Sequence, residues 1–238
     1  MWRQTMPLFR KNLLLSTAIA CTIQFCIYIT MHGMFMWFPF ISHNMVEFRN
    51  NNPLNSSRIC DVINAKIQFE DNSQKIDGVK HCTEKLENGT FLLTMLMEFV
   101  YGLGFIVVGF VLQIVKKVHI LFFILFAFGT CGILINFIYD TTLALVVYNM
   151  LFLCGVGIQV LSEIVVDLYP TNLRAMALCI SLMFGRLGGV FGAYMIALLL
   201  ATNCEMTFNI AGMGLVVSAF LTFLIPKVKN LENKPVVG

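Results

Sequence analysis

The chain has 238 residues, a length that ordinarily suggests one or two soluble domains. Its composition excludes them, because 58% of the residues are hydrophobic and only 12% are charged, against about 25% charged in a typical soluble protein. A water-soluble fold of this size has no interior large enough to bury so much apolar surface. The net charge of +3 is too small to indicate a nucleic-acid partner. The composition therefore predicts a polytopic membrane protein whose partner is the lipid bilayer.

Six apolar runs are long enough to cross a bilayer as helices. They cover residues 13–42, 91–115, 119–138, 141–168, 173–202 and 206–225. Each has about 20 to 30 residues, and none shows the apolar/polar alternation of a membrane β-strand. The expected fold class is all-α, with an N-terminal segment at 1–12, one long polar loop at 43–90, five further helices within 91–225 and a tail at 226–238.

Lysines and arginines in the short segments indicate which way the helices point. Nine of them fall on one side of the predicted membrane: Arg3, Arg10, Lys11, Lys116, Lys117, Arg174, Lys227, Lys229 and Lys234. The short connections of the opposite side, around Asp140 and Cys204, contain none. By the positive-inside rule we expect both termini in the cytoplasm, with loop 43–90 outside a plasma or vesicle membrane.

The long loop carries two N-glycosylation sequons, at Asn55 and Asn88, and one pair of cysteines. Because Cys60 and Cys82 are the only cysteines in this loop, we expect a disulfide between them in an oxidising compartment. The six other cysteines, Cys204 among them, lie in or beside the apolar runs and are expected to behave as small apolar side chains.

Glu98, Glu163 and Arg186 fall within the apolar runs, where a charge is costly and each needs a partner or an aqueous cavity. Arg186 is a candidate for binding an anionic substrate group or for a gating pair, and Glu98 for its counter-charge or for proton coupling. The alternative is a structural ion pair within the membrane. Glu163 lies one turn from Asp167, near the predicted cytoplasmic edge, and neutralisation by burial is equally consistent with its position.

Smaller polar and glycine patterns also occur within the runs. His32 and Asn209 are expected to form interhelical hydrogen bonds, the usual role of a lone polar residue in a membrane helix. The fifth run contains two overlapping small-xxx-small pairs, Gly185/Gly189 and Gly188/Gly192, which favour close helix packing or a helix that slides beside a cavity.

The sequence carries no signature of an enzyme. It lacks the HExxH, GxSxG and P-loop patterns, and no run holds a clustered set of His, Cys and Asp residues for a metal. We therefore expect no catalytic residues, no metal site and no cofactor.

Residues 167–175, Asp-Leu-Tyr-Pro-Thr-Asn-Leu-Arg-Ala, lie between the fourth and fifth runs. This segment resembles the acidic-x-Tyr-Pro-Thr-x-x-Arg-Ala signature of the major facilitator superfamily. The resemblance implies a cytoplasmic gate motif made of Asp167, Tyr169, Pro170 and Arg174, with Asp167 and Arg174 paired across the helix ends. Segments 24–28, 36–39 and 183–186 are similar to the synaptic vesicle glycoprotein 2-like branch.

One segment departs from the family pattern. Residues 109–117 occupy the place of a Gly-x-x-x-Asp-Arg-x-Gly-Arg loop, but the acid and the first arginine are missing. This departure argues against the cytoplasmic charge relay that such a loop supports in the family.

The resemblance covers nearly the whole chain, but only as the C-terminal six-helix half of the family fold, helices seven to twelve. It implies transport of a small organic solute by alternating access, with substrate held between two halves near the midplane. The expected partner is the missing N-terminal half or a second copy of the chain. The alternative is a half-size, transport-incompetent membrane protein that binds a partner through its glycosylated loop or its bundle face.

Overall fold

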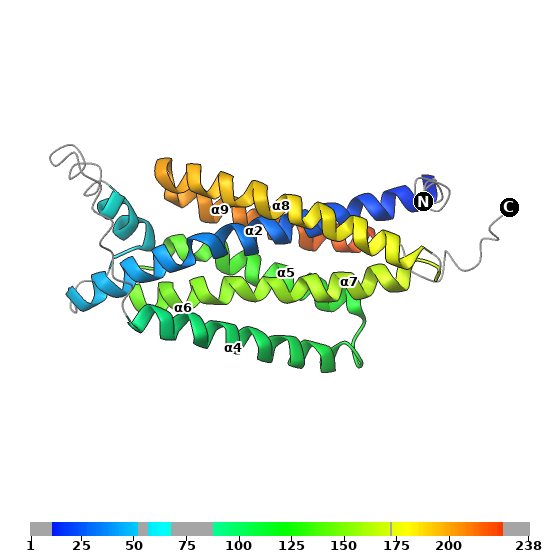
Figure 1. Ribbon diagram of the computed structural model, residues 1–238, viewed down its shortest axis with the longest axis horizontal. Coiled ribbons are helices and arrows are strands. Elements are labelled where there is room, and N and C mark those ends of the chain that lie inside the picture. Colours follow the sequence, from blue (N-terminus) through cyan, green and yellow to red (C-terminus); the bar gives the residue numbers. More distant parts are fainter. Residues whose placement is uncertain (1–10, 52–56, 68–87, 172, 226–238) are drawn as a thin grey trace.

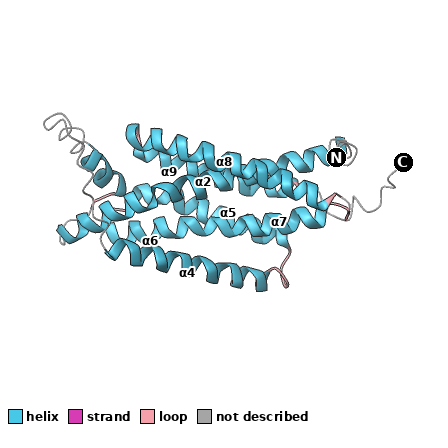
Figure 2. Ribbon diagram, in the orientation of Figure 1, coloured by secondary structure: helices cyan, strands magenta, loops and turns pink. Residues whose placement is uncertain are grey.

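The computed structural model describes residues 11–51, 57–67, 88–171 and 173–225. These residues are mostly helical, with no strand among them (Figure 2). Within these described ranges six helical spans are long and apolar enough to cross a membrane: Leu13–Asn51, Thr94–Val111, Lys117–Phe137, Thr141–Leu168, Arg174–Thr202 and Cys204–Leu224. The predicted all-α class and the six spans are therefore confirmed.

The α-helices are α2 (Lys11–Asn51), α4 (Asn88–Val111), α5 (Lys117–Leu134), α6 (Thr141–Phe152), α7 (Val156–Leu168), α8 (Arg174–Thr202) and α9 (Cys204–Leu221). In the described part of the chain three single-turn 3₁₀ helices accompany them: η2 (Ile135–Phe137) extends α5, η3 (Leu153–Gly155) joins α6 to α7, and η4 (Thr222–Leu224) extends α9. A further short helix covers residues 59–67. The fourth predicted span thus consists of two α-helices separated by a tighter turn.

The first helix is longer than the apolar run that predicted it. At 1.5 Å per residue, α2 is roughly 60 Å long, twice the thickness of a bilayer core of about 30 Å. It passes through Pro39 and ends at Asn51, where the sequence reads Asn-Asn-Asn-Pro over residues 50–53. Its extra turns are held by packing, because Met45, which lies beyond the predicted end of the lipid-crossing segment at residue 42, is still buried.

The helices run along one common direction (Figure 1). The start of α2 and the end of η4 lie at one end of the bundle, which we call the terminal end. The helix over residues 59–67 lies at the opposite end, which we call the loop end.

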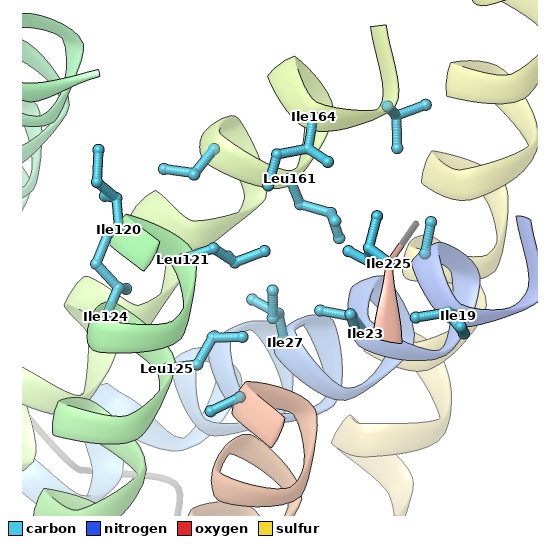
Figure 3. Close-up of a cluster of buried hydrophobic side chains, with 14 of the residues drawn as sticks. Ile19, Ile23, Ile27, Ile120, Leu121, Ile124, Leu125, Leu161, Ile164 and Ile225 are labelled. Carbon is cyan, nitrogen blue, oxygen red and sulfur yellow. The ribbon is translucent and has the colours of Figure 1, made fainter. Parts of the chain in front are cut away.

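The buried apolar side chains form two clusters. One joins α2, α5 and α7, where Ile23, Ile27, Leu121, Leu125 and Leu161 pack together (Figure 3). The other joins the second half of α2 to residues 59–63, α6 and α9. Its centre is Tyr148, whose ring stacks on Phe38 at a centroid distance of 5.9 Å.

The closest helix contact joins α2 and α8 and depends on glycine. A Cβ placed on Gly188 would lie 2.5 Å from the backbone oxygen of Phe25, and one on Gly192 would lie 2.7 Å from that of Ile29. A Cβ on Gly185 would lie 2.8 Å from the ring of Tyr28. The fifth span therefore places its small residues directly on the backbone of the first.

A second glycine contact, between α5 and α9, was not anticipated from the sequence. A Cβ on Gly212 would lie 2.7 Å from the backbone oxygen of Gly129, and one on Gly132 would lie 3.1 Å from Cα of Gly212. Gly212 belongs to no small-xxx-small pair facing this contact, so its role becomes visible only once the two helices are seen to cross there.

Replacing Gly188 with alanine should destabilise the bundle by about 1 to 3 kcal/mol, because the backbones of α2 and α8 must separate to admit the methyl group. Thermal unfolding of detergent-solubilised protein measures the loss. Gly102→Ala is the matched control, since Gly102 lies on the exposed face of α4 with no atom within 4 Å of an added Cβ. Equal melting temperatures for the two variants would contradict the close contact.

Candidate functional site

An open groove runs between α2 and α8 and has a volume of about 580 Å³. From α2 it is lined by Tyr28, His32, Phe35 and Met36. From α8 it is lined by Arg186, Gly189, Val190 and Ala193. Its volume falls within the range of about 300 to 1,000 Å³ that is typical of small-molecule sites.

Helical periodicity explains why these side chains meet. Tyr28, His32 and Met36 follow one another at intervals of four residues and so share one face of α2. On the facing side of α8, Gly189 and Ala193 have the same interval and fill little space. The α2 side of the groove is therefore lined by aromatic and apolar side chains, and small residues of α8 form its base.

Arg186 supplies the charge of the groove. Its side chain is exposed, and no described carboxylate lies within 4.0 Å of its guanidinium. Arg186 lies roughly 18 Å along α8 from Arg174, at 1.5 Å per residue, and so near the middle of the span. Beside it, His32 packs its ring on Tyr28 at a centroid distance of 4.7 Å.

Glu98 does not act as the counter-charge of Arg186 in this structure. It is exposed on α4 and does not line the groove. One turn further along α4, the Tyr101 hydroxyl faces the sulfur of Met31 at 3.7 Å. The proposed ion pair between Arg186 and Glu98 is therefore not formed among the described residues.

Glu163 and Asp167 form a second charged cluster, at the terminal end. The Lys117 ammonium lies 3.2 Å from a carboxylate oxygen of Glu163 and 2.8 Å from one of Asp167. The two acids are four residues apart on α7, so both reach the lysine at the start of α5. Residues 109–117 lack the acid and the first arginine of the pattern with which they were compared, yet Lys117, the last of them, pairs with both acids of α7.

The expected pairing of Asp167 with Arg174 is replaced by other contacts. Arg174 donates from Nε to the backbone oxygen of Tyr169 at 2.9 Å, while Asp167 pairs with Lys117. The cause is the chain path: α7 ends at Leu168 and Tyr169 is extended, so the arginine folds back over the turn. The buried Tyr169 also shares a 2.6 Å hydrogen bond with Thr17 of α2.

A disulfide joins Cys60 to Cys204, with the two Cα atoms 5.5 Å apart. The predicted bridge from Cys60 to Cys82 is therefore wrong, and Cys82 lies outside the described residues. The error arose because the long loop was treated as closing on itself, whereas residues 59–67 pack on the start of α9. Cys204 was the only cysteine in a short connection on the same predicted side, a signal that the sequence did offer.

Polar contacts surround this disulfide at the loop end. An Arg58 nitrogen lies 3.7 Å from a Glu205 oxygen, and its guanidinium stands 4.5 Å above the Tyr139 ring. A hydrogen bond from Arg58 to the Tyr139 hydroxyl raises the pKa of the guanidinium above its ordinary value. Asn209 accepts a 3.0 Å hydrogen bond from Asn136, which confirms its predicted interhelical role.

The glycosylation sequons stay predictions. Asn55 lies outside the described residues, and Asn88 is the first residue of α4. The sequence had placed the second sequon in the loop before the helix.

Comparison with known proteins does not assign a family: no family model, no curated protein and no solved structure matches this chain. The resemblance of residues 167–175 to the major facilitator signature therefore stays a prediction.

A non-reduced proteolytic digest should contain a peptide pair linked through Cys60 and Cys204. Cys60→Ser and Cys204→Ser should each lower stability by about 2 to 5 kcal/mol, because either change removes the same crosslink. Cys82→Ser is the control and should leave the linked pair intact. A mass matching Cys60 joined to Cys82 would contradict the observed pairing.

The pair between Lys117 and Asp167 should show a coupling of about 0.5 to 1 kcal/mol, since both side chains are partly exposed and screened by water. A double-mutant cycle with Lys117→Met and Asp167→Asn, followed by thermal unfolding, measures this coupling. Lys116→Met, which changes an exposed neighbour, should show none with Asp167→Asn. Equal coupling of Asp167 to both lysines would show that the effect comes from the general surface charge and not from a specific contact with Lys117.

Proposed function

We propose that this chain is one six-helix half of a secondary transporter of the major facilitator kind, which moves a small organic solute by alternating access. The observation that carries the proposal is the groove, where an exposed arginine lies near the middle of an apolar span. The family-like segment at residues 167–175 supports it, since this segment occupies the turn between α7 and α8.

The position of Arg186 argues for a water-filled cavity beside the groove. An arginine facing lipid at this depth costs at least about 2.5 to 3.5 kcal/mol on insertion scales. Snorkelling recovers little of that cost from near mid-depth. A cavity between two halves avoids the cost, because it leaves the guanidinium hydrated until a solute binds.

The exposed helices support an assembly of two halves. None of the residues in the apolar stretch Thr94–Val111 of α4 is buried within this chain. In the span Thr141–Leu168, by contrast, half of the apolar stretch is buried. In the apolar stretch of α8 only 22% of the residues are buried. We propose that the missing half, or a second copy of this chain, covers the side of the groove while lipid covers the rest.

Both ends of the chain's bundle carry contacts that would keep it rigid during transport. Lys117 bridges α5 to α7 at the terminal end, and the Cys60–Cys204 disulfide ties residues 59–67 to α9 at the loop end. A rigid half can rock against its partner around a central site, as alternating access requires. We expect the terminal end to face the cytoplasm, as the distribution of lysines and arginines predicts.

A binding role without transport is the rival function. The disulfide-fixed helix over residues 59–67 is the feature that favours it, since a held outside segment suits recognition of a partner. The two functions differ in one measurable property, which is whether solute crosses a sealed membrane.

Transport is tested with the native complex, purified through a tag on this chain and reconstituted into sealed liposomes. The liposomes receive a mixture of small carboxylates, amines and sugars, and mass spectrometry identifies the solutes that accumulate inside. We expect accumulation above that of empty liposomes, and its loss in Arg186→Gln. An intact complex that accumulates nothing under any imposed ion gradient would favour the rival.

A further inference from the structure

We propose that the groove between α2 and α8 binds a small organic monoanion with a flat apolar body, of the class of aromatic carboxylates. This inference rests on the proposed function for its setting within the membrane. Binding and transport are nevertheless separable, and the experiment below measures binding alone.

The charge of the groove selects an anion. The described ion pairs occupy other cations, at the two ends of the bundle, and leave Arg186 without a carboxylate. Away from bulk water an uncompensated guanidinium attracts an anion strongly and repels an amine. The planar fork of arginine also fits a carboxylate in a bidentate arrangement, which a simple point charge does not offer.

The walls of the groove select an apolar, flat body. The rings of Tyr28 and His32 lie 4.7 Å apart at an interplanar angle of 33° and form one side. Phe35, Met36 and Val190 are 41%, 71% and 74% exposed, so their apolar surface is available to a ligand. A polyol such as a sugar would meet few hydrogen-bonding partners on these walls and would leave the arginine charge uncompensated.

The geometry also distinguishes two roles that the sequence left open for Arg186. A gating pair needs an acid on a neighbouring helix within reach, and Glu98, the candidate that the sequence offered, does not line the groove. An anionic ligand needs an exposed guanidinium next to open volume, and this is the arrangement found.

A thiol placed in the groove reports binding. The full chain carrying Ala193→Cys is labelled with N-ethylmaleimide in nanodiscs, and mass spectrometry follows the labelling of that one peptide. Benzoate should slow labelling severalfold, whereas benzylamine and benzyl alcohol, of similar size but cationic and neutral, should not. Val217→Cys, on the exposed surface of α9 and outside the groove, is the matched control and should be unaffected by all three. If the Ala193→Cys protein does not elute as a single species in size-exclusion chromatography, Val190→Cys serves as the groove thiol in its place.

Arg186→Gln should weaken benzoate protection at least about tenfold, which corresponds to about 1.4 kcal/mol. Arg186→Lys keeps the positive charge but loses the planar guanidinium that can bind a carboxylate in a bidentate manner. Its protection by benzoate should therefore lie between that of the unchanged chain and that of Arg186→Gln. Equal protection by benzoate and benzyl alcohol, or protection that survives Arg186→Gln, would overturn the assignment. So would the absence of protection by benzoate at millimolar concentration.

The outcome for the anion site is distinguishable from that for transport. Protection by benzoate in a complex that accumulates no solute keeps the site and removes the transport function. Accumulation confined to amines or sugars, without protection by benzoate, keeps transport and removes the anion site.

Discussion

The near-contact of two backbones, α2 and α8, is the constraint on which the rest of the structure depends. Membrane helices gain little from hydrophobic association, because lipid is as apolar as their side chains, so close packing has to supply the affinity. Gly188 and Gly192 allow it by leaving the backbone oxygens of Phe25 and Ile29 unobstructed. The same approach determines which side chains of α2 stand beside Arg186. A packing requirement and the candidate site are therefore two aspects of one interface.

Polar contacts are distributed unevenly along the bundle. The ion pairs lie where the helices end: a lysine between two acids at the terminal end, and, beside the disulfide, an arginine with an acid and a tyrosine at the loop end. Between them the helices meet through apolar clusters and glycines. Such a body resists distortion at its ends, while near its middle Arg186 has no carboxylate partner among the described residues. This division is consistent with a half that moves as a unit around a ligand held at mid-depth.

Hydropathy alone predicted the six spans, because lipid demands an uninterrupted apolar run with its backbone hydrogen bonds satisfied internally. It could not predict that α2 continues to Asn51, since those turns are held by packing with residues 59–63 rather than by lipid. Arg186 was recognisable as a charge in an apolar run, whereas its neighbours Tyr28 and His32 depend on how two helices cross. Lys117 was counted only as a topological marker, because its partners on α7 lie far away in sequence.

The disulfide at the loop end has a consequence for how the protein is made. Cys60 and Cys204 are 144 residues apart, and Cys204 begins the last span. On the predicted topology, Cys60 crosses the membrane during synthesis long before Cys204 has been made, whereas Cys82 follows only 22 residues after Cys60. Correct oxidation has to wait until five spans are inserted and the sixth begins. A Cys60–Cys204 bond can therefore form only after the start of the sixth span has been made, and a bond formed earlier between Cys60 and Cys82 would have to be broken first.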